Sequence, residues 1–197
     1  MLFSSPIFLF VFLPLTLIAF YLARTYIGGK AALTAVVTSS LVFYGYWNPP
    51  YLALLIGSML VNFAFVRRLS ERPTNLCLAL AISLNLAVLG YFKYRFFMYD
   101  NLAAIFEFSP SSLSPDNNIV PLAISFFTFQ QIALLIDIKD RKTEISSILD
   151  YMAFVALFPQ LIAGPIVLYR EMREQFAEIK AQNFSGLELF CPGIIIF

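Results

Sequence analysis

The sequence predicts an all-α protein that crosses a membrane several times, and three observations support this prediction. Of its 197 residues, 60% are hydrophobic and only 13% are charged, which is more apolar material than a soluble core can bury. Five apolar runs are each close to the length that a helix needs to cross the hydrocarbon layer. A sixth run, residues 151–170, is equally apolar but is broken by Pro159 and by Gly164 and Pro165. We therefore expect about five transmembrane helices and one broken segment.

Short polar connections separate the five predicted spans. Asn48-Pro49-Pro50 forms a tight connection between the second and third spans. Asn62 and Asn85 lie inside the third and fourth spans, and an asparagine there usually hydrogen-bonds a neighbouring helix for about 0.6–2 kcal/mol. We prefer this interpretation to a substrate contact. The spans are expected at residues 6–23, 31–47, 51–66, 75–92 and 119–138.

Lysine and arginine are distributed unevenly over the connections. Eight of them fall in alternate connections on one side, whereas Lys93 and Arg95 fall on the other. The positive-inside rule then predicts that the amino terminus and the loop 109–118 are extracytoplasmic. The eight cations on the cytoplasmic side are Arg24, Lys30, Arg67, Arg68, Arg72, Lys139, Arg141 and Lys142.

The broken segment is the first candidate for a functional site. Proline and glycine interrupt helix hydrogen bonds, and in lipid the freed backbone groups need partners from protein or water. A full crossing would carry Arg170 and Arg173 outside, against the charge bias. We therefore predict that residues 151–170 enter and leave the membrane on the cytoplasmic side, followed by a charged surface helix at 171–180. An ordinary proline kink without chemistry is the alternative.

Several chemistries are excluded by composition. The chain contains no histidine, so the commonest general base and metal ligand is missing. Cys77 and Cys191 are far apart and form no Cys-x-x-Cys pair, so no thiolate metal site is expected. The net charge of +1, without a basic run, gives no reason to expect nucleic-acid binding.

Four stretches together resemble the membrane-bound O-acyltransferase (MBOAT) family, in its bacterial branch for alginate O-acetylation and teichoic-acid D-alanyl transfer. They are FSSPIFLF at residues 3–10, LGYFKY at 89–94, PLAISFFTFQ at 121–130 and FPQLIAGPI at 158–166. The resemblance covers residues 1–180, which we interpret as the amino-terminal part of one membrane domain of this family. Residues 181–197 diverge from it.

The resemblance implies a multi-pass protein of the bacterial inner (cytoplasmic) membrane. The whole enzyme is expected to transfer an acyl group, such as acetyl from acetyl-coenzyme A, from a cytoplasmic thioester to hydroxyls of an extracytoplasmic polysaccharide such as alginate. Besides the lipid bilayer, it implies extracytoplasmic acyl-transfer proteins as partners. The catalytic histidine of the family lies downstream of the Ala-Gly-Pro segment. Since this sequence has none, we assign no catalytic residue, and we interpret the chain as an enzyme cut short by a frameshift or a premature stop.

Four residues remain as candidates for lining a substrate tunnel or positioning a substrate: Gln130, Gln160, Gly164 and Pro165. The glutamines can donate hydrogen bonds to a polarised carbonyl, but an amide cannot act as a base. Two other functions stay open. A transporter or channel element also uses broken helices, although every acidic residue here lies outside or at the end of a span. The third possibility is a membrane scaffold without chemistry of its own.

Overall fold

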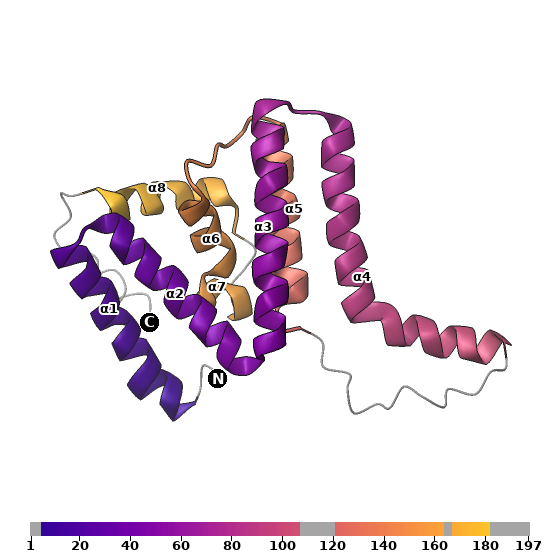
Figure 1. The fold of residues 1–197 in the computed structure, drawn as a ribbon, viewed down its shortest axis with the longest axis horizontal. Coiled ribbons are helices and arrows are strands. Elements are labelled where there is room, and N and C mark those ends of the chain that lie inside the picture. Colours follow the sequence, from indigo (N-terminus) through magenta and orange to yellow (C-terminus); the bar gives the residue numbers. More distant parts are fainter. Residues whose placement is uncertain (1–4, 107–120, 164–166, 182–197) are drawn as a thin grey trace. The chain divides into compact units, whose positions relative to one another are not determined.

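The computed structural model describes residues 5–106, 121–163 and 167–181, and the regular secondary structure in these ranges is entirely helical (Figure 1). The chain divides into two compact units. The first consists of Met1–Leu52, Ile145–Phe158 and Val167–Phe197, and the second of Ala53–Glu144 and Pro159–Ile166. Each unit is described separately below.

The first unit is built around helix α2 (Gly29–Trp47). A short π-helical stretch, η1 (Phe8–Phe12), continues directly into α1 (Leu13–Tyr26), and α1 packs along α2. Two further helices, α6 (Ile148–Ala156) and α8 (Tyr169–Lys180), also pack on α2. Segments more than a hundred residues apart in the sequence therefore share one core.

The connections at both ends of α2 follow from their residue types. Gly28, between α1 and α2, has φ +122°, which side-chain-bearing residues rarely adopt. At the other end, α2 stops at Trp47 and α3 begins at Pro49, because proline is favoured at the first position of a helix. The tight connection predicted at residues 48–50 is confirmed.

Four phenylalanine rings form the aromatic centre of the first unit. They come from η1, α2 and the first residue of α7 (Phe158–Ala163), and every pair of ring centroids lies 5.4–5.9 Å apart. Most of the pairs are edge-to-face or tilted, as the ring quadrupoles prefer. The cluster consists of Phe8, Phe12, Phe43 and Phe158.

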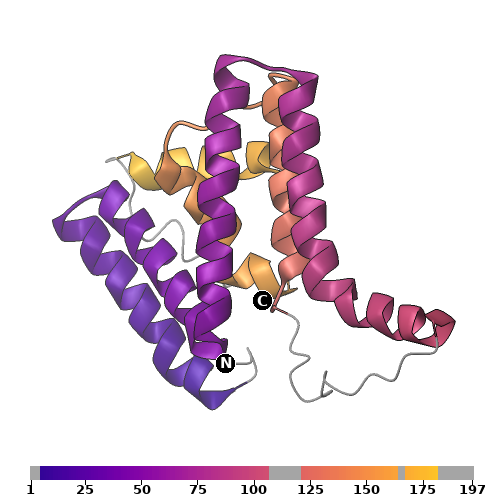
Figure 2. The ribbon, with the colours of Figure 1, turned by 45° about the vertical axis from the view of Figure 1, so that its right-hand side comes forward.

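The second unit contains most of α3 (Pro49–Glu71), together with α4 (Asn75–Phe106) and α5 (Ile124–Lys139). Helices α3 and α4 form an antiparallel hairpin through the turn at residues 72–74, and α4 packs on α5. In its second half α4 changes direction, as Figure 2 shows, and it continues as a helix to Phe106. The helix therefore extends beyond the predicted span, which ended at residue 92.

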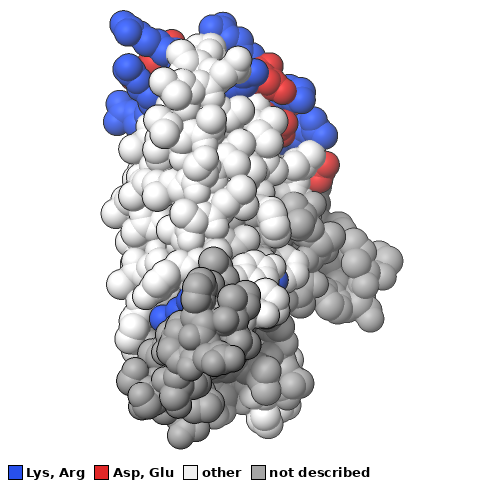
Figure 3. Space-filling model, turned by 90° about the vertical axis from the view of Figure 1, so that its right-hand side faces the viewer, with Lys and Arg blue, Asp and Glu red and all other residues white. Residues whose placement is uncertain are grey.

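Three helices in the described ranges are long and apolar enough to cross a membrane: Phe8–Tyr26, Pro49–Glu71 and Asn75–Arg95. Figure 3 shows one face that is largely free of charge along its length, with lysine, arginine, aspartate and glutamate gathered at one end. An all-α membrane protein fits these observations. The prediction of about five spans is not confirmed, because α2 is rich in threonine and serine and α5 has 16 residues against the roughly 20 that a span needs.

The start of α5 corrects one predicted boundary. We expected the fifth span to begin at residue 119, whereas α5 begins at Ile124. Ala123, just before it, has φ +58°, a left-handed conformation that cannot continue a right-handed helix. Pro121 consequently precedes the helix instead of lying in its first turn. Residues 119 and 120, and the predicted loop 109–118, lie outside the described residues.

The broken segment consists of two short helices. Helix α6 ends at Ala156, Leu157 has non-helical backbone angles, and α7 spans Phe158–Ala163. Pro159 therefore lies in the first turn of α7, where a missing N–H costs little. The N–H of Phe158, at the break, donates to Ser40 Oγ at 3.3 Å. The backbone group that the break frees thus has a partner on α2.

The two ends of the broken segment come together in the first unit. The ring of Phe154 on α6 meets the ring of Tyr169, the first residue of α8, with centroids 5.4 Å apart in an edge-to-face arrangement. The chain thus returns close to its starting point between these residues. That this segment enters and leaves the membrane on one side stays a prediction.

Candidate functional site

A pair of asparagines links α3 to α4 in the second unit. Asn62 Nδ2 donates to Asn85 Oδ1 at 3.1 Å, and Asn85 Nδ2 donates to Asn62 Oδ1 at 2.6 Å. Both side chains are buried, and each Nδ2 also donates to a carbonyl in its own helix. All four side-chain polar atoms are therefore paired. The predicted role of these residues in helix association is confirmed.

The adjacent amides on α5 differ in their partners. Gln131 Nε2 donates to Ser58 Oγ on α3 at 3.1 Å, so this buried amide joins two helices of the second unit. Gln130 is equally buried, at 2% exposure, but its Oε1 has no hydrogen-bond partner among the described residues. Leaving a buried amide unpaired costs about 1–3 kcal/mol. Oε1 of Gln130 is therefore a buried hydrogen-bond acceptor that the described part of the fold leaves unused.

Gln160 on α7 shows the same feature more strongly. Its side chain is 8% exposed, and both Oε1 and Nε2 lack hydrogen-bond partners. Among the described residues it is the one side chain with two such buried atoms. Gln130 and Gln160 both belong to the second unit. Gly164 and Pro165, the other two candidates, lie outside the described residues.

An unpaired buried amide is suited to a polar ligand. Its Oε1 accepts from a hydroxyl or an N–H, and its Nε2 donates to a carbonyl. A group that supplied both partners would recover the cost of burying the amide. The two glutamines can accordingly bind and orient a hydroxyl, an amide or a carbonyl group.

Proton transfer has no evident agent among the described residues. The carboxylate of Asp140 is exposed, and its hydrogen bond with Lys142 lowers its pKa. In the part of the chain that the structure describes, no group of three or more His, Cys, Asp or Glu side chains could hold a metal ion. The described residues can therefore bind and orient a ligand, but they include no evident group for proton transfer.

One buried ion pair was not predicted from the sequence. Both carboxylate oxygens of Asp150 accept from Lys180 Nζ, at 2.8 and 2.9 Å, and Asp150 is 1% exposed. We expected Lys180 only as part of a charged surface helix. Ser147 and Asp150 do carry a sequence signal, because the serine caps α6 by accepting from the Asp150 N–H. That signal indicates a helix start and not the ionic partner.

Comparison with known proteins gives relatives over most of the chain. A peptidoglycan O-acetyltransferase of Helicobacter pylori is 36% identical over an alignment of 231 positions, which covers 100% of this chain and 42% of the relative. Probable alginate O-acetylases AlgI of Pseudomonas putida and Pseudomonas aeruginosa are each 36% identical over 185 positions, covering 89% of this chain and 37% and 34% of those proteins. No family model and no solved structure matches.

The described helices define the class as an all-α membrane protein with a broken, apolar segment. Within this class, the chain is similar over most of its length to bacterial O-acetylases, as expected of a sequence that resembles the membrane-bound O-acyltransferase family. The resemblance inferred from the four sequence stretches is therefore confirmed. The chain spans about two fifths of the length of the first of these relatives.

Proposed function

We propose that this chain provides the membrane-embedded framework of an O-acetyltransferase that acts on a polysaccharide. In this proposal an acetyl group passes from a cytoplasmic thioester, such as acetyl-coenzyme A, to a hydroxyl of an extracytoplasmic acceptor such as alginate. The protein lies in the bacterial inner membrane with its amino terminus outside, and it works with extracytoplasmic acyl-transfer proteins. The names and identities of the relatives support the reaction class.

The observation that carries the proposal is the pair of buried glutamines with unpaired polar atoms, Oε1 of Gln130 and both Oε1 and Nε2 of Gln160. Gln130 and Gln160 lie in two of the four stretches through which the sequence resembles the family, PLAISFFTFQ and FPQLIAGPI. Each retains unused hydrogen-bonding capacity in an apolar surrounding, where the cost of an unpaired amide favours ligand binding. We assign both residues to the path of the acyl donor or acceptor, with Gly164 and Pro165 next to Gln160.

The base that deprotonates the acceptor hydroxyl lies outside these 197 residues in this proposal. The chain has no histidine, and the aligned part of the first relative is 42% of its length. An acyl transfer to a hydroxyl near neutral pH needs a group that accepts the hydroxyl proton. The chain therefore contributes architecture and substrate positioning, and the remaining sequence of such an enzyme contributes the proton transfer.

A chimaera tests this division of roles. Residues 1–180 replace the aligned part of the Helicobacter pylori enzyme, and O-acetylation of peptidoglycan is measured in cells that lack their own enzyme. We expect activity above the empty-vector level, and a loss of about tenfold or more when Gln130 or Gln160 is changed to Met, since each substitution removes a positioned hydrogen bond. Gln175, which is exposed on α8, provides the matched control Gln175→Met.

The transporter alternative predicts a different result. A chimaera that inserts stably but shows no O-acetylation, together with substrate movement by the unmodified chain, would favour a permeation element. A stably inserted chimaera without either activity would favour the scaffold. Full activity after both glutamine substitutions would contradict the assignment of the site while leaving the proposed reaction in place.

A further inference from the structure

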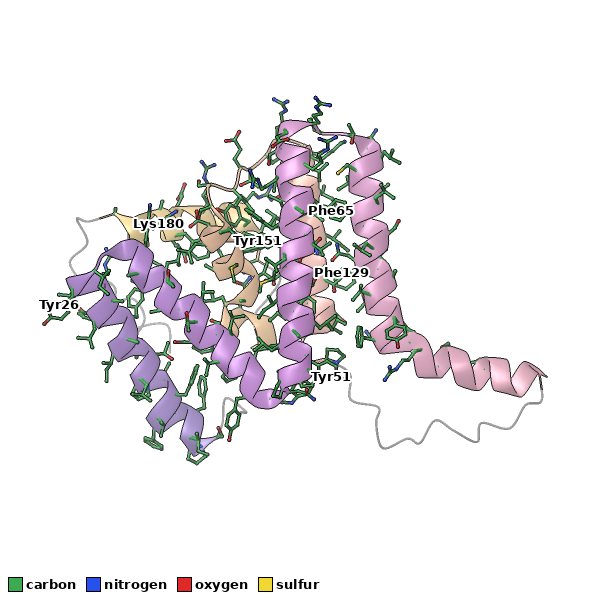
Figure 4. The ribbon with its side chains drawn as sticks, viewed as in Figure 1. Tyr26, Tyr51, Phe65, Phe129, Tyr151 and Lys180 are labelled. Carbon is green, nitrogen blue, oxygen red and sulfur yellow. The ribbon has the colours of Figure 1, made fainter. Side chains whose placement is uncertain are left out.

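Four residues from four different helices meet at the carboxyl end of α8. Arg24 lies in the last turn of α1 and Gly29 begins α2, while Asp150 lies in the first turn of α6 and Lys180 ends α8. All of them belong to the first unit. Figure 4 labels Lys180 at this end of α8.

The ion pair joins the beginning of α6 to the end of α8. Lys180 Nζ lies 2.8 and 2.9 Å from the two carboxylate oxygens of Asp150, whose side chain is 1% exposed against 25% for Lys180. A buried carboxylate is tolerated only when it is paired, so removing the lysine leaves an uncompensated charge. This contact thus holds the two helix ends together.

Arg24 binds the same end of α8 from α1. Its guanidinium donates to the carbonyl oxygen of Ile179 and, at 2.9 Å, to that of Ala181. The last carbonyls of a helix lack partners within the helix, and the helix dipole makes this end partly negative. A cation from a neighbouring helix therefore caps α8.

Gly29 allows the backbones of α2 and α8 to approach each other closely. A Cβ atom at this position would lie 2.5 Å from Lys180 Cα and 2.9 Å from the Lys180 carbonyl carbon, which is too short for real atoms. Any side chain at Gly29 would push α8 away from the start of α2. The sequence therefore uses glycine where the two backbones touch.

We propose that Arg24, Gly29, Asp150 and Lys180 form a clamp that holds the two ends of the broken segment together. The clamp fixes α6, which opens the segment, to α8, which follows it. The clamp itself requires no acetyl transfer, so it does not rest on the proposed function.

The docking of α8 can be measured at Met172, on its buried face. In the full chain with Cys77 and Cys191 replaced by Ser, Met172→Cys is reacted with a maleimide in detergent, and Arg173→Cys gives the rate for an exposed site. We expect Lys180→Met to raise the Met172→Cys rate about tenfold or more, because α8 then opens locally. Lys142→Met, which removes an exposed ion pair with Asp140, should change the rate by less than about twofold.

Two further variants distinguish loss of the clamp from general misfolding as the cause of faster labelling. The reciprocal exchange of Asp150→Lys with Lys180→Asp should restore slow labelling, to within about threefold of the parent, since it restores the pair. If Lys180→Met does not purify as a single species, Arg24→Gln leaves the ion pair in place and tests the cap alone, with labelling about threefold faster or more. Unchanged labelling in every clamp variant that purifies would overturn the clamp.

Discussion

Asn62 and Asn85 exchange two side-chain hydrogen bonds, at 3.1 and 2.6 Å, between neighbouring apolar helices. We predict that Asn62→Leu lowers the free energy of unfolding in detergent by about 1–3 kcal/mol, because it leaves the buried Asn85 amide without its partner. The double replacement should cost less than the sum of the two single ones. Asn101→Leu, at an exposed position of α4, provides the control. Additive effects of the two replacements would contradict the pairing.

Two adjacent glutamines should respond in opposite directions. Gln131→Met removes a bond to Ser58 and should destabilise the protein by about 1 kcal/mol, whereas Gln130→Met removes an unpaired buried oxygen and should leave stability unchanged or raise it. Functional sites often carry such destabilising groups, so the same Gln130→Met change should lower activity in the chimaera. Denaturant titration of both variants checks the stability. Equal losses of stability in the two variants would show that the Gln130 amide is hydrogen-bonded.

The break between α6 and α7 depends on one hydroxyl. Ser40 Oγ accepts from the Phe158 N–H, so Ser40→Ala should cost about 1–3 kcal/mol by leaving a buried N–H unpaired. Ser39→Ala, one residue earlier and half-buried, is expected to change stability by less than about 0.5 kcal/mol. The difference in the free energy of unfolding between the two variants, from denaturant titration, measures the contribution of this hydrogen bond. Equal stability of both variants would mean that the N–H finds another partner.

The isolated chain should not transfer acetyl groups. Purified protein incubated with labelled acetyl-coenzyme A and an alginate oligosaccharide is expected to give no more product than buffer, because the chain contains no histidine, the commonest general base. The Helicobacter pylori relative with its own acceptor serves as the positive control. Product above the buffer level would place a base within these 197 residues.

Local signals in the sequence predicted the parts of the fold that depend on neighbouring residues. The Asn-Pro-Pro connection, the break near Pro159 and the helix-linking asparagines all follow from the preferences of single residues. The start of α5 could not be predicted, because nothing in the residue type of Ala123 indicates a left-handed backbone. That conformation depends on the surrounding structure.

The candidate site was predictable only in part. Two adjacent glutamines in an apolar span indicate buried amides, but the sequence does not tell which one is bonded; the structure pairs Gln131 and leaves the Gln130 oxygen unpaired. The clamp was missed because its members are separated by up to 156 positions, from Arg24 to Lys180, and three of them are charged residues of ordinary surface type. Long-range pairing of this kind leaves no periodic pattern in a single sequence.

The central claim of the account is that residues 151–170 enter and leave the membrane on the same side. Glu144 and Glu174 are exposed residues on either side of this segment. Each is replaced by cysteine in the chain without Cys77 and Cys191, and the cells are treated with an impermeant maleimide before and after permeabilisation. We expect both sites to be labelled only after permeabilisation. Labelling of Glu174→Cys in intact cells, with Glu144→Cys protected, would show that the segment crosses the membrane and would contradict the account.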